Sequence, residues 1–199
     1  ITVHASELKL ENKILMNSVQ YHTEDIHFNE DKAWLLGFLL CYNSRLKQTE
    51  IVNKFSEIMK KYFGNITDVN ELYSSQYLNY FIKKYEGINK DCRHIPNEVF
   101  NWNKNAKMAF LCGMIDAKDA LYFEQNHSIV KFETINKEIA LQQMALAQTL
   151  NMPAKINYIT DKYNTIIYSV EFRPCRDIIK YLTLKTNIDN FISKSTSLN

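Results

Sequence analysis

Two strongly apolar segments, each with a glycine near its middle, constrain the fold of this chain most. Segments 35–40 and 110–115 carry Gly37 and Gly113. A glycine inside a helix costs about 1 kcal/mol relative to alanine, yet two of the chain's four glycines stand here. Because glycine lacks the Cβ that keeps two backbones apart, the pattern predicts buried helices over 33–42 and 108–118 that pack through Gly37 and Gly113. Two unrelated core helices are the alternative at this point.

Hydrophobic periodicity predicts the elements around these two helices. Amphipathic helices are expected over 49–63 (ended by Gly64), 74–85 and 136–150, and from residue 176 onward, and 103–120 forms the second apolar helix. Strands are expected at 121–124, 128–135, 154–160 and 165–172. The second half therefore alternates helices with pairs of strands, whereas the first half shows three helices and no hairpin. The predicted fold class is α+β.

The connection between the first apolar helix and the next helix is short. Residues 44–49 separate them, and a two-stranded hairpin needs about ten residues or more. We therefore expect a direct connection into the 49–63 helix, without the pair of strands that follows the second apolar helix.

Composition and charge exclude few classes of function. The net charge is +2 and the isoelectric point about 8.3, below the value of about 9 that marks a strongly nucleic-acid-binding domain. The chain has no visible signal peptide, and its apolar stretch 33–41 is too short to span a bilayer. We expect a cytoplasmic or otherwise intracellular protein with no membrane partner. Because the chain opens with Ile1, we also expect a fragment, a processed product or a piece of a larger polypeptide. The four cysteines are Cys41, Cys92, Cys112 and Cys175. No two of them form a CxxC pair, so no zinc site is expected.

Several motifs resemble those of one protein family. The sequence GMIDA at 113–117 resembles the middle of the LAGLIDADG motif, and RHIPNEVF at 93–100 resembles the stretch that precedes the second such motif in intein endonucleases. VKFET at 130–134, followed by KEIA at 137–140, resembles that family's second-repeat hairpin and helix. VHASELK at 3–9 resembles a strand of the intein splicing domain, although Glu11 and Asn12 replace its Gly and Asp. Over about residues 1–185, the chain resembles a degenerate LAGLIDADG (DOD-type) homing endonuclease domain of an intein.

The resemblance implies an architecture and partners. The fold would hold two pseudo-repeated LAGLIDADG units, with motif helices packed at the centre, two sheets forming a saddle over DNA, and the first repeat truncated. Double-stranded DNA and the host protein of the intein, or a larger polypeptide, would be the partners. The expected divisions are a remnant of splicing-domain strands and linker at 1–30, the first repeat at 31–105, the second at 106–192 and a tail at 193–199.

The positions of the catalytic acids depart from the family pattern. In this family an acid at the C-terminal foot of each motif helix binds Mg²⁺, because cleavage of a phosphodiester needs a hard cation held by oxygen ligands. Aligned on the motifs, Tyr42 and Lys118 take the two acid positions, and Asp119 takes that of the terminal glycine. Asp116 and Asp119 are candidate substitutes. We expect a hydrolase-like domain that binds duplex DNA with impaired cleavage, with no cofactor, or with Mg²⁺ if the displaced acids function.

The strands of the second half supply the candidate DNA contacts. Lys and Arg favour phosphate contacts, and Asn favours base edges. A merely solvated sheet face is equally expected at each position. The alternatives for the whole chain are a DNA-binding or structural insert module reused within a larger host protein, and an active endonuclease that uses displaced acids. The candidate contacts are Lys131, Glu133, Lys155, Asn157, Lys162, Tyr168 and Arg173.

Overall fold

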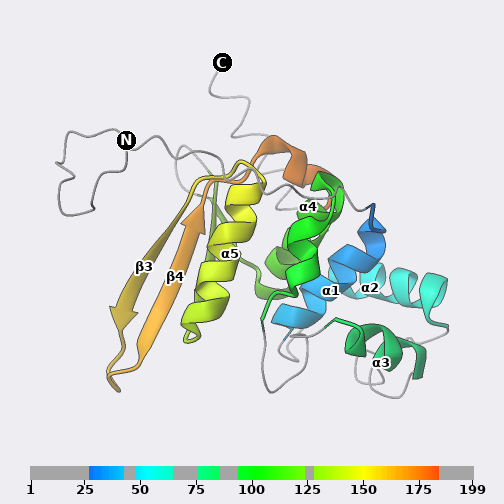
Figure 1. The fold of residues 1–199 in the computed structure, drawn as a ribbon, viewed down its shortest axis with the longest axis horizontal. Coiled ribbons are helices and arrows are strands. Elements are labelled where there is room, and N and C mark those ends of the chain that lie inside the picture. Colours follow the sequence, from blue (N-terminus) through cyan, green and yellow to red (C-terminus); the bar gives the residue numbers. More distant parts are fainter. Residues whose placement is uncertain (1–26, 43–47, 65–75, 86–93, 124–127, 184–199) are drawn as a thin grey trace.

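The computed structural model describes residues 27–42, 48–64, 76–85, 94–123 and 128–183. Helices and one antiparallel sheet confirm the predicted α+β class (Figure 1). In chain order the elements are α1 (Glu30–Cys41), α2 (Thr49–Tyr62), α3 (Gln76–Lys83), the 3-10 turn η3 (Asn97–Asn101), α4 (Lys104–Lys118), β1 (Leu121–Phe123), β2 (Ser128–Thr134), α5 (Lys137–Thr149), β3 (Ala154–Thr160), β4 (Ile166–Phe172) and the 3-10 turn η4 (Arg176–Lys180).

The two apolar helices begin side by side. Asn29 caps α1 by accepting a hydrogen bond from the backbone N–H of Lys32 (3.1 Å), and Asn103 caps α4 in the same way. Just before the caps, Phe28 stacks on Trp102 with ring centroids 4.0 Å apart. Because the helices start together and pack along their length, α1 and α4 run in the same general direction (Figure 1).

Helix α2 is the next element after α1 in the part of the chain that the structure describes. It begins at Thr49, as the sequence predicts, whereas most of the predicted short connection over 44–49 lies outside the described residues. Its apolar face buries Ile51, Phe55 and Met59 in the core. Gly64 follows the helix with φ +98°, the left-handed conformation that favours glycine at a helix end.

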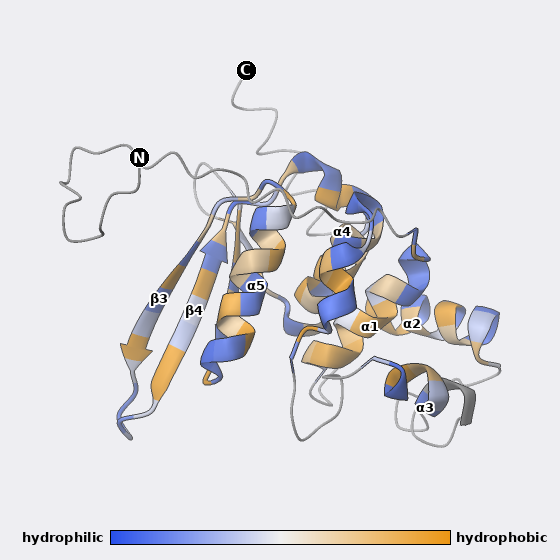
Figure 2. Cartoon of the chain, viewed as in Figure 1, coloured by the Kyte–Doolittle hydropathy of each residue, from blue (hydrophilic) through white to orange (hydrophobic). Residues whose placement is uncertain are grey.

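The sheet has the strand order β1-β2-β4-β3 and is antiparallel throughout. One face packs on α5, and Figure 1 shows the helices gathered on this side of the sheet. Val130 pairs with Phe172 and Phe132 pairs with Val170, and all four side chains are buried. Their strand neighbours project from the opposite face, which we call the outer face. Figure 2 shows the apolar residues concentrated on α1, α4 and the far end of the β3–β4 hairpin.

Three parts of the predicted fold are not found in the described residues. The helix predicted from residue 176 is wrong in type, because Arg176–Lys180 forms only a 3-10 turn, which begins two residues after Pro174. The described residues contain one sheet, built from 121–172, rather than the two sheets of a saddle. The predicted front strands and the tail at 193–199 lie outside the described residues.

Candidate nucleic-acid interface and helix feet

The crossing of α1 and α4 is built on Gly37 and Gly113, as the sequence predicts. A Cβ added at Gly37 would lie 2.8 Å from the carbonyl carbon of Phe110 and closer still to its oxygen. A Cβ added at Gly113 would meet the carbonyl of Trp34 in the same way. Phe110 stands three residues before Gly113, and Trp34 stands three before Gly37. In each contact the glycine of one helix therefore meets the residue three positions before the glycine of the other helix. Such reciprocal contacts are those of a two-fold symmetric interface.

The C-terminal feet of the two helices point toward the same end of the pair. Tyr42 ends α1 and is half-buried, and its ring stacks on Phe38 with centroids 5.4 Å apart. Lys118 and Asp119 end α4 and are exposed. Asp119 has φ 50° and ψ 47°, in the left-handed region that glycine adopts most readily. Asp119 therefore occupies a position whose backbone conformation favours glycine.

Asp116 serves the interior and not the feet. Its side chain is 2% exposed, and one oxygen accepts hydrogen bonds from Trp34 Nε1 (2.8 Å) and Thr183 Oγ1 (2.6 Å). Burial raises the pKa of Asp116, and the hydrogen bonds from Thr183 and Trp34 oppose that rise. Asp116 is therefore not available as an exposed ligand, and of the two candidate substitutes only Asp119 stands at a foot.

A lysine completes this interior polar cluster, which sequence reasoning missed. Lys54 Nζ donates to the backbone oxygen of Tyr181 (2.8 Å) and lies 4.5 Å from the centroid of the Trp34 ring. Burial lowers the pKa of Lys54, and the nearby Asp116 charge raises it. The signal in the sequence is the position of Lys54, which shares helical spacing with the apolar face of α2.

The outer face of the sheet brings together four of the predicted DNA-contacting residues, Lys131, Glu133, Lys155 and Asn157. The strand register places Lys131 and Lys155 on either side of Glu171, and Asn157 beside Ser169. Both lysines are held by acids of the same face. Lys131 Nζ lies 2.8 Å from Glu133 Oε1, and Lys155 Nζ lies 2.9 Å from Glu171 Oε2.

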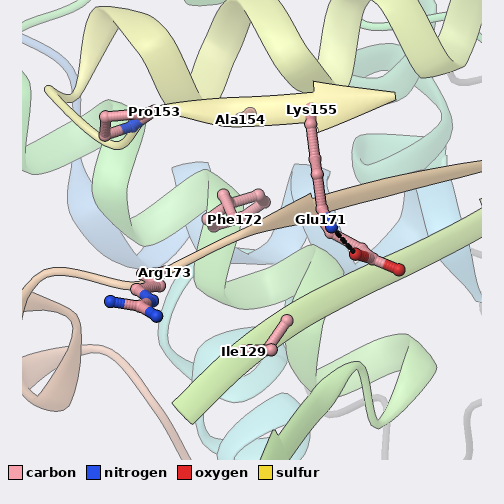
Figure 3. Close-up of a pocket in the computed structure, with 7 residues that line it drawn as sticks. All are labelled: Ile129, Pro153, Ala154, Lys155, Glu171, Phe172 and Arg173. Carbon is pink, nitrogen blue, oxygen red and sulfur yellow. Dashed lines mark ion pairs between the residues drawn. The ribbon is translucent and has the colours of Figure 1, made fainter. Parts of the chain in front are cut away.

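A hollow of about 430 Å³ lies at one end of this face (Figure 3). Arg173 is exposed on one side of the hollow, and the Lys155–Glu171 pair closes the other. Ile129, between them, gives the hollow an apolar floor. Its lining residues are Ile129, Pro153, Ala154, Lys155, Glu171, Phe172 and Arg173.

Two predicted contact residues lie apart from this face. Tyr168 lies on the same face of β4 as Val170 and Phe172, so its side chain projects toward α5. There it lines an apolar groove of about 520 Å³ with Leu141. Lys162 stands in the turn between β3 and β4, with its Nζ 4.9 Å from the centroid of the Tyr163 ring. Neither shares the outer face with Lys131 and Lys155.

Comparison with known proteins gives no assignment: no protein-family model matches the chain, and no curated protein matches it. In the part of the chain that the structure describes, no group of three or more His, Cys, Asp and Glu side chains could hold a metal ion. Within the same residues, no helix is both long and apolar enough to cross a membrane.

Proposed function

We propose that this chain is a degenerate LAGLIDADG-type domain that binds duplex DNA through the outer face of its sheet and does not cleave it. The observation that carries the proposal is the reciprocal contact of Gly37 and Gly113 in two helices of the same direction. Each glycine stands at the same place in a similar apolar motif, and the second helix is followed by a sheet with one open face. That combination is what the resemblance implies for a DNA-binding LAGLIDADG unit.

The residues at the C-terminal ends of α1 and α4 account for the absence of cleavage in this proposal. Hydrolysis of a phosphodiester near neutral pH needs a divalent cation to activate water and to neutralise the developing charge. Mg²⁺ is held by one or two carboxylates, and the phenol of Tyr42 and the ammonium of Lys118 supply none. These residues do not fit the metal. The positive charge of Lys118 favours phosphate binding instead.

The test measures binding and cleavage separately on a library of duplex sites, in Mg²⁺ and in Mn²⁺. We expect binding that weakens steeply with salt and no strand scission. Specific cleavage that disappears in Asp119→Asn but survives in Asp116→Asn would support the displaced-acid enzyme. Absence of binding at low salt would favour a structural insert within a host protein.

A further inference from the structure

The charged side chains of the outer face nearly cancel. Lys131 and Lys155 supply two cations and Glu133 and Glu171 supply two carboxylates, and Arg173, which borders the face just beyond β4, leaves a net charge of +1. Both carboxylates are already in contact with lysines. A DNA phosphate that approaches the sheet therefore meets cations whose charge is largely neutralised by neighbouring acids.

Arg173 differs from the two lysines. Among the described residues it has no ion-pair partner, and it lies just beyond the end of β4, where it lines the same hollow as Glu171. A guanidinium binds phosphate oxygens through two parallel N–H donors. In Figure 3 this group lies on the opposite side of the hollow from the Lys155 side chain, so the hollow is bordered by two cations.

The Lys155–Glu171 ion pair is placed so that it can be exchanged. The Lys155 side chain is 68% exposed, whereas that of Glu171 is 22% exposed, so the lysine is free to move and the carboxylate stays at the edge of the hollow. An ion pair whose lysine is this exposed contributes little to stability, so breaking it costs little. A DNA backbone phosphate can therefore displace Glu171 from the Lys155 ammonium. The Glu171 carboxylate that loses its partner then repels the phosphate.

We propose that the hollow between Arg173 and Lys155 is a phosphate-binding position for duplex DNA, and that Glu171 is an internal competitor that holds Lys155 until a phosphate displaces it. This inference rests on the proposed function and adds to it the residue that limits affinity. Glu133 acts on Lys131 in the same manner through the 2.8 Å contact between them.

The test compares DNA binding by the full chain and by single variants over a range of salt concentrations. Glu171→Gln frees one cation, and the logarithm of affinity falls with the logarithm of salt by about 0.9 per phosphate neutralised. We expect the variant's salt slope to steepen by about 0.9, and its affinity for a mixed-sequence duplex to rise about tenfold at about 50 mM salt. Arg173→Gln is expected to lower both quantities by a similar amount.

The matched control is Asp177→Asn. It makes the same change in net charge and removes the acid of another exposed ion pair, with Lys104 at 2.6 Å, on the helical side of the molecule. We expect its slope to equal that of the unmodified chain, and circular dichroism checks that each variant is folded. Equal gains in Glu171→Gln and Asp177→Asn would overturn the inference while leaving the proposed function intact. Loss of binding in every protein, even at low salt, would overturn both.

Discussion

Alanine at Gly37 tests whether the close approach of α1 and α4 holds the fold together. The new Cβ would lie 2.8 Å from the Phe110 carbonyl carbon, whereas ordinary contacts begin at 3.4 Å, so the helices must separate by at least 0.6 Å, the difference between the two. The obstacle is backbone and cannot rotate away. Overpacking costs about 1–3 kcal/mol, and we take the upper end. Helix propensity returns about 1 kcal/mol.

The expected net effect is a loss of about 2 kcal/mol in the free energy of unfolding. For a chain of this size that lowers Tm by about 4–8 °C. Denaturant unfolding followed by circular dichroism measures it. If the glycine were only a weak point in an isolated helix, Gly37→Ala would instead stabilise the protein by about 1 kcal/mol. A neutral or stabilising result would refute the reasoning.

The double variant Gly37→Ala/Gly113→Ala sharpens the test. One separation of the helices makes room for both methyl groups, so the double variant should lose less stability than the sum of the single variants. Gly64→Ala is the control, because no atom lies within 4 Å of its added Cβ and its cost is backbone strain alone. Combined with Gly37→Ala it should be additive. Full additivity of the two helix glycines would contradict a shared separation.

Further predictions concern Asp116 and the helix feet. Asp116→Ala should destabilise the fold by about 1–3 kcal/mol, because it leaves the donors of Trp34 and Thr183 unpaired; denaturant titration checks this. Because burial raises the folded-state pKa of Asp116, its contribution to stability is fully present below the ordinary aspartate pKa and is lost as pH rises through the folded value. The stability of the unmodified chain minus that of Asp116→Asn should therefore increase on acidification, and a flat difference would contradict it. Restoring acids with Tyr42→Asp and Lys118→Asp should create a Mg²⁺-dependent rise in Tm that the unmodified chain lacks.

Local chemistry made much of the fold predictable. Asn103 and Gly64 mark helix ends by capping and by a left-handed backbone, and both effects act within a few residues. The contact of Gly37 with the second motif was predictable because a glycine has few other uses inside a buried helix. The type of η4 was not predictable, since it depends on how the segment after Pro174 packs on α4.

The site was less predictable than the fold, for two physical reasons. Which acid meets which lysine depends on strand register, and the sequence alone does not place Glu171 beside Lys155. The hydrogen bond between Trp34 and Asp116 joins residues on different helices, so no local pattern indicates it. Tyr168 is different, because alternation from Phe172 already places its side chain on the α5 side.

The placement of the tryptophans has a spectroscopic consequence. The chain has two, and both belong to the α1–α4 pair: Trp34 lies at the crossing, and Trp102 stacks on Phe28 where the helices begin. Both are almost fully buried, at 1% and 2% exposure. Intrinsic tryptophan emission therefore reports on the helix pair and carries no direct signal from the sheet. A ligand that binds the outer face should leave this emission unchanged, whereas any separation of the helices should shift it toward longer wavelength.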